Sequence, residues 1–195
     1  MTRKACLLVL MNPPSAFDEE FNAWYDTEHI PERLAVPGIE TGLRYGSVGP
    51  APRYLAIYDL STLAVMDSPE YLRVALDQSS PWTRRVTARA NVQRFTGEQV
   101  WPGDRLTGRA AQIGLVRFRG LDAAGLDAAV AGMRAIYEDR AEVRQVRVLA
   151  DSSAPDAITA FGVVEAATPL PASFDPAAFG IATAAIDLVN FYVPL

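Results

Sequence analysis

The chain has 195 residues, of which 50% are hydrophobic and 21% charged, so the sequence predicts a globular protein of one mid-sized domain or two small ones. A formal net charge of −5 does not favour a nucleic-acid partner. The single cysteine, Cys6, excludes an intrachain disulfide framework, and no apolar run is long enough to predict a membrane span, so we expect a cytoplasmic protein without a membrane partner.

The N-terminal part of the chain predicts a strand followed by a helix. Residues 5–11 form an apolar run that is typical of a buried strand. The following helix has Ser15 or Asp18 as its predicted cap. We expect its regular part to end near His29, because Pro31 disfavours helical geometry at the residue before it.

The remaining elements predict the same order of strands and helices twice. In the first half they are strands at 39–48 and 53–60, helices at 69–77 and 81–89, and a strand at 92–101. In the second half they are a strand at 112–119, a helix at 121–140, strands at 143–149 and 157–165, a short helix at 174–179 and a strand at 184–193. The order βαββαβ is that of the ferredoxin-like unit, so we expect an α+β fold with units at 1–103 and 104–195.

Packing two such units has a physical consequence. A four-stranded sheet with both helices on one face leaves its other face bare, and Leu43, Tyr45, Tyr54 and Tyr58 are expected to cover that face. Sheet-to-sheet packing would bury both bare faces. A chamber between the sheets, or between a sheet and its helices, would suit a small hydrophobic or aromatic ligand.

The densest chemistry surrounds His29, the only histidine. Phe21, Tyr25 and His29 recur every four residues and therefore share one stripe of the predicted helix. An imidazole titrates near neutrality and can move protons in an enolisation, dehydration or cyclisation, assisted by a tyrosine hydroxyl. We predict His29 and Tyr25 as catalytic residues. The predicted substrate-binding residues are Trp24, Glu28, Tyr45, Tyr54, Tyr58 and Trp82.

A structural role remains open for the same residues. A histidine at a helix C-terminus interacts favourably with the helix dipole, and an aromatic stripe is what any amphipathic helix packs against a sheet.

The pattern aromatic-x3-His-x-Pro at Tyr25, His29 and Pro31, followed by Pro37-Gly38 and later by Ser80-Pro81-Trp82-Thr83-Arg84-Arg85, resembles the EthD-like branch of the dimeric α/β-barrel superfamily. The resemblance implies that the two sheets pair into a barrel within one chain, as a monomeric pseudo-dimer or a homodimer of it. It also implies a site with His29 between helix and sheet. Superfamily members include muconolactone isomerases, polyketide cyclases and dehydratases, cofactor-free monooxygenases and haem-binding enzymes. The motif does not return in the second half.

Three functions remain open at this stage. The first is a cofactor-independent isomerase, cyclase or dehydratase that acts on a small aromatic or polyketide-like carbonyl compound through His29. The second is a non-catalytic protein that binds a hydrophobic metabolite. The third is haem binding through His29. The sequence has no Gly-rich phosphate loop and a single His without a Cys partner, so it predicts no nucleotide cofactor and no metal site.

Overall fold

A computed structural model describes residues 3–49, 51–75, 78–151, 153–171 and 173–195. Eight antiparallel strands close into a barrel in the order β1-β3-β2-β8-β5-β7-β6-β4. The strands are β1 (Ala5–Asn12), β2 (Leu43–Ser47), β3 (Tyr54–Leu60), β4 (Asn91–Trp101), β5 (Gln112–Leu121), β6 (Val143–Asp151), β7 (Ile158–Ala166) and β8 (Ile186–Pro194).

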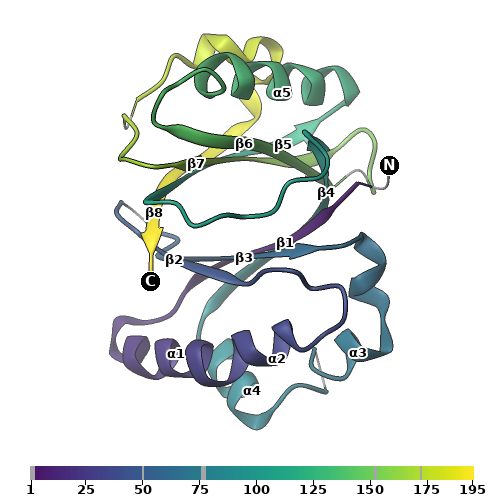
Figure 1. Cartoon of the computed structure of the whole chain (residues 1–195), viewed down its shortest axis with the longest axis vertical. Helices are drawn as coiled ribbons and strands as arrows, with labels where there is room; N and C mark the ends of the chain where they lie inside the picture. Colours follow the sequence, from purple (N-terminus) through teal and green to yellow (C-terminus); the bar gives the residue numbers. More distant parts are fainter. Residues whose placement is uncertain (1–2, 50, 76–77, 152, 172) are drawn as a thin grey trace.

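Helices cover the barrel on two opposite sides (Figure 1). On one side lie η1 (Ser15–Phe17), α1 (Asp18–Trp24), η2 (Tyr25–His29), α2 (Ile30–Leu34), η3 (Leu63–Asp67), α3 (Pro69–Leu72) and α4 (Pro81–Thr87). On the other side lie α5 (Ala123–Tyr137) and the 3₁₀ segment η5 (Pro176–Ala185). None of the helices built from described residues is long and apolar enough to cross a membrane.

The side chains of β1 point alternately into two separate layers of the core. Leu7, Val9 and Met11 belong to the core under the first group of helices, whereas Leu8 and Leu10 belong to the core inside the barrel. Because successive side chains of a strand point to opposite faces, a strand covered on both sides is apolar throughout. This explains why residues 5–11 read as a continuous apolar run.

The predicted order of elements is confirmed, including the hairpin in which β2 pairs with β3. Several boundaries are wrong. The helix predicted at 69–77 is α3, which ends at Leu72, and residues 76–77 lie outside the described part of the chain. The short helix predicted at 174–179 is η5, which extends to Ala185.

The helical region around His29 also differs from the prediction. The helix does not end near His29 but passes through Pro31 into α2, and neither Ser15 nor Asp18 caps it through a side chain. The reason is the π-helical turn η2, in which the Ile30 N–H reaches back to the Tyr25 carbonyl. The wider turn directly before Pro31 accommodates a residue that lacks an N–H and would crowd a regular helix.

The prediction that Leu43, Tyr45, Tyr54 and Tyr58 share one face of the sheet is wrong. Tyr54 and Tyr58 lie in the core under the helices, whereas Leu43 and Tyr45 face the barrel interior. The register explains this difference, because Tyr45 pairs with Leu55 and not with either tyrosine of β3. Opposite residues of paired strands share a face, so Tyr45 lies with Leu55.

The barrel interior also contains a buried charged cluster made of Asp59, Arg147 and Glu165. Arg147 is 0% exposed and donates to Asp59 at 2.7 Å and to Glu165 at 3.3 Å. Thr107 accepts a further hydrogen bond from Arg147 at 2.6 Å. Asp59 belongs to β3 and the other two charges belong to β6 and β7, so the cluster connects the two halves of the chain.

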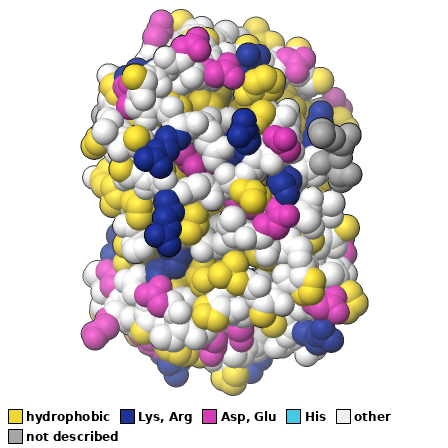
Figure 2. All heavy atoms as spheres, viewed as in Figure 1, with side chains coloured by type: hydrophobic (Ala, Val, Ile, Leu, Met, Phe, Trp, Pro, Cys, Tyr) yellow, Lys and Arg dark blue, Asp and Glu magenta, His cyan; other side chains and the backbone are white. Residues whose placement is uncertain are grey.

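Charged side chains on the surface are mixed in sign. Figure 2 shows that Lys and Arg side chains alternate with Asp and Glu on the visible face, among scattered hydrophobic ones. An interspersed surface of this kind lacks the single-sign field that steers a charged partner, so this face does not indicate one.

Candidate functional site

A cavity of about 390 Å³ lies between the first group of helices and the sheet, and we call it the helix–sheet cavity. Strand β1 supplies an apolar floor of alternate side chains. The helical segments and β4 supply the groups that carry chemistry, which are Trp24, Tyr25, His29, Arg33, Tyr71, Thr83 and Arg94. Its size is in the range of small-molecule pockets.

The turn η2 holds the imidazole of His29 within an aromatic cage. The ring centroid of His29 is 4.3 Å from that of Trp24 and 5.1 Å from that of Tyr25, which lies edge-on at 85°. Its Nδ1 atom is buried and has no hydrogen-bond partner among the described residues. Burial lowers the pKa of His29 well below 6.5, and the nearby charges of Arg33 and Arg94 lower it further. The imidazole is therefore neutral near neutral pH.

Two guanidinium groups make the cavity positive. Arg33 is 5% exposed, donates to the Val74 carbonyl at 2.7 Å and lies 5.5 Å from the centre of the Tyr71 ring. Arg94 donates to the Tyr71 hydroxyl. Within the described part of the chain, neither arginine forms an ion pair with a carboxylate. The buried charge of Arg33 and the exposed charge of Arg94, neither paired with a carboxylate, favour a ligand that carries or develops negative charge.

Tyr25 is a protonated phenol next to the imidazole. Its hydroxyl donates to Met11 Sδ at 3.3 Å. Burial raises the pKa of Tyr25 to about 12, against an opposing effect of Arg44, whose guanidinium lies 4.3 Å from the ring centre. Tyr58 is fully buried behind it, and burial raises the pKa of Tyr58 well above 10.0. Both phenols therefore stay protonated at neutral pH.

Glu28 and Trp24 hold the helices around the cavity together. Glu28 accepts hydrogen bonds from Ser80 and from Thr83, the latter at 3.2 Å, and Ser80 caps α4 through the Thr83 N–H. The Trp24 indole N–H donates to Thr83 at 3.0 Å. These bonds link α1 and η2 to the start of α4, and a substrate contact for Glu28 remains a prediction.

The structure brings only part of the predicted site together. Trp24, Tyr25 and His29 line the cavity, and the Tyr58 ring lies 6.3 Å from the His29 ring. The other predicted residues lie elsewhere: Tyr54 packs on Phe21, Trp82 packs against the core under the helices, and Tyr45 lies across the sheet inside the barrel.

Sequence reasoning missed Arg33, Tyr71 and Arg94. Arg33 follows His29 by four residues, which places both on the same face of a helix. Its position was therefore predictable only for a helix that continues past Pro31. Arg94 lies on the same face of β4 as Val92, and alternation along that strand was its signal. Tyr71 lies in the four-residue helix α3, and no sequence pattern connected it with His29.

The lowered pKa of His29 predicts how stability depends on pH. Below 6.5 the unfolded chain binds a proton at His29 while the folded chain does not, so the free energy of unfolding falls as the pH drops. We expect a slope of at most about 1.4 kcal/mol per pH unit from this group. Chemical denaturation across this range should show that His29→Gln removes this slope, and an identical slope in both proteins would contradict the prediction.

The sequence matches no protein-family model and no curated protein. Solved structures do match the fold. An anthrone oxidase-like protein aligns with a TM-score of 0.66 at 12% identity, over 100% of this chain and 92% of its own. A proposed monooxygenase of Lactobacillus acidophilus aligns at 0.56 and 9% identity over 99% and 93%. A heme-binding protein of Thermus thermophilus aligns at 0.54 and 9% identity over 100% and 92%.

At these identities the likeness concerns the fold and does not transfer an activity. No three His, Cys, Asp or Glu side chains of the described residues are grouped to hold a metal ion. The closed eight-stranded barrel and these neighbours together show an α+β fold, a helix-covered antiparallel barrel that this chain shares with them.

Proposed function

We propose that the chain is a cofactor-independent acid/base enzyme that removes a proton from a small aromatic or polyketide-like carbonyl compound, with His29 as the base. The observation that carries this proposal is a neutral imidazole in a cavity that also contains two arginines without carboxylate partners. A neutral imidazole accepts a proton, and the arginines favour the negative charge that proton removal leaves on the substrate.

The positive charge that His29 gains is compensated only if the substrate becomes an anion in the same step. Burial, together with the charges of Arg33 and Arg94, makes protonation of His29 unfavourable, which is why its pKa is low. Loss of a proton from a carbon next to a carbonyl forms an enolate, whose oxygen can accept hydrogen bonds from Arg94 or from the Tyr71 hydroxyl. The enolate then compensates the new imidazolium. Return of the proton to another carbon gives isomerisation. Attack of the enolate carbon on a second carbonyl of the same molecule forms a carbon–carbon bond and an alkoxide, which takes the proton back from the imidazolium and gives cyclisation.

We further propose that the chain is a tandem of ferredoxin-like units, 1–103 and 104–195, with an EthD-like first unit that carries the site. The matching strand orders β4-β1-β3-β2 and β8-β5-β7-β6 support this division. His29 is the only histidine, so the second unit has no equivalent base. The likeness to an anthrone oxidase-like protein supports an aromatic substrate, though only at the level of fold.

Haem fits the cavity poorly. A histidine that binds iron usually holds its second ring nitrogen in a hydrogen bond to a carboxylate or carbonyl, whereas Nδ1 of His29 has no such partner among the described residues. The imidazole also packs against the Trp24 ring. We expect no Soret band that depends on His29 when the purified protein is mixed with haemin.

Exchange of carbon-bound hydrogen tests the proposed function directly. The protein is incubated in D₂O with a panel of small hydroxyaryl ketones and diketones, and mass spectrometry measures deuterium incorporation. We expect catalysed incorporation next to the carbonyl group for at least one compound. Thermal stabilisation by these compounds without exchange or conversion would instead favour the non-catalytic binding of a hydrophobic metabolite.

A further inference from the structure

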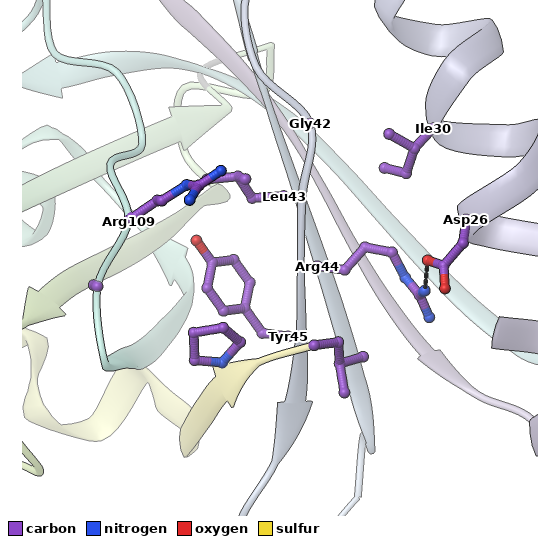
Figure 3. A pocket seen from close by; sticks show the side chains of 10 residues that line it. Asp26, Ile30, Gly42, Leu43, Arg44, Tyr45 and Arg109 are labelled. Carbon is purple, nitrogen blue, oxygen red and sulfur yellow. Dashed lines mark hydrogen bonds and ion pairs between the residues drawn. The ribbon is translucent and has the colours of Figure 1, made fainter.

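A second cavity, of about 520 Å³, lies along β2 where it meets β8, and we call it the seam cavity. Asp26, Ile30 and Arg44 line it from the helical side of β2, and Tyr45 and Arg109 line it from the other side. Its walls are mainly apolar and include Leu43, Ala110 and Pro194. Two polar side chains, Tyr45 and Arg109, face each other across it (Figure 3). The ion pair of Arg44 with Asp26 lines the cavity from the opposite side of the strand, so the one carboxylate of the lining is already paired (Figure 3).

The Tyr45 hydroxyl is a buried donor without an acceptor. Tyr45 is 2% exposed, and its hydroxyl has no hydrogen-bond partner among the described residues. Burial and the nearby carboxylate of Glu165 raise the pKa of Tyr45, so the hydroxyl keeps its proton. A buried hydroxyl that makes no hydrogen bond costs free energy, which a ligand with an acceptor oxygen would recover.

Arg109 supplies the charge at the same place. It lies in the linker between β4 and β5, and no carboxylate of the described residues forms an ion pair with its guanidinium. Its side chain points toward the Tyr45 hydroxyl (Figure 3). The two groups are donors and the adjoining walls are apolar, which together select a ligand with an anionic head and an apolar body.

We propose that the seam cavity is a second binding site, separate from the helix–sheet cavity, for a small organic carboxylate. The carboxylate accepts hydrogen bonds from Tyr45 and Arg109, and the apolar body lies against Leu43 and Pro194. No described residue lines both this cavity and the helix–sheet cavity, so the site does not depend on the proposed enzyme function.

Calorimetric titration with 3-phenylpropanoate and with its uncharged amide tests the site. We expect saturable binding of the carboxylate, weakened about tenfold or more by Arg109→Gln and by Tyr45→Phe, with little binding of the amide. Arg105→Gln is the matched control, because it removes the same charge from an exposed position of the same linker that does not line the cavity.

Several outcomes would overturn the proposal. They are absence of binding at millimolar concentration, equal affinity for the amide, and equal weakening by the Arg105 and Arg109 variants. A crystal structure with 3-(4-bromophenyl)propanoate locates the bromine by anomalous scattering. Bromine against Leu43 or Pro194 supports the site, whereas bromine next to His29 places the ligand in the helix–sheet cavity and contradicts it. Arg109 is exposed, so its variant is expected to fold even if Tyr45→Phe does not.

Discussion

Replacing Arg147 by methionine is expected to lower the free energy of unfolding by about 3–5 kcal/mol, because it leaves buried carboxylates without a positive partner. Arg147 is 0% exposed, and Asp59 and Glu165 are 1% and 2% exposed. Burial raises the pKa of Glu165, and the charge of Arg147 opposes that rise. Without the guanidinium, the cost of keeping these carboxylates ionised inside the barrel is no longer compensated.

The remaining hydrogen bonds do not replace the lost charge. Asp59 still accepts from Thr41 and from the Thr107 N–H, and Glu165 still accepts from the Gly108 N–H at 2.9 Å. These donors are neutral, so they solvate a carboxylate without neutralising it. The loss should appear in chemical denaturation as a lower midpoint at an unchanged slope.

Two comparisons make this result specific to the buried charges. Arg73→Met removes an exposed arginine paired with Glu70 at 3.2 Å and should cost no more than about 1 kcal/mol. Combining Arg147→Met with Asp59→Asn and Glu165→Gln removes all three charges and should recover part of the lost stability. A loss of the same size for the Arg73 and Arg147 variants would show that the cluster is not what stabilises the barrel.

The order of strands and helices was predictable because each element carries its own local signal. Apolar runs, Pro-containing turns and Ser-Pro pairs mark where elements begin, and Ser68 and Ser80 cap α3 and α4, which start at the prolines that follow. The face that each tyrosine occupies was not predictable in the same way. Alternation fixes which residues of one strand share a face, but only the register between β2 and β3 decides whether Tyr45 and Tyr58 lie together.

The site was predictable where its residues are neighbours in sequence. Trp24, Tyr25 and His29 lie within two helical turns, and the helix–sheet cavity brings them together. Arg94 reaches the same cavity from β4, and its contact with Tyr71 spans 23 residues of chain, so no short pattern could reveal it. The charged cluster in the barrel was missed for the same reason, since Arg147 and Asp59 are 88 residues apart.

For the compound that exchanges with D₂O, His29→Gln is expected to lower turnover about 10²- to 10⁴-fold, the usual contribution of a general base. Glutamine is close to histidine in size and forms hydrogen bonds, but it cannot accept the proton. The substrate should still bind, because Arg33, Arg94 and the apolar floor of the cavity remain. The loss should therefore appear in kcat with little change in KM.

The pH dependence separates a base from a merely structural histidine. The pKa of His29 lies well below 6.5, so kcat/KM of the wild type should be flat near neutrality and fall only in acid, as the imidazole takes up a proton. The residual activity of His29→Gln should lack that acid limb.

A matched variant reports on packing alone. Trp82→Phe alters an aromatic residue of the same helical layer that does not line the cavity, and it should keep both turnover and the acid limb. Turnover by His29→Gln equal to that of the wild type, in a folded protein, would remove His29 from the chemistry. Another group would then have to act as the base. The described lining of the cavity contains no carboxylate; of its two phenols, Tyr25 is kept protonated by burial, and Tyr71 accepts a hydrogen bond from Arg94.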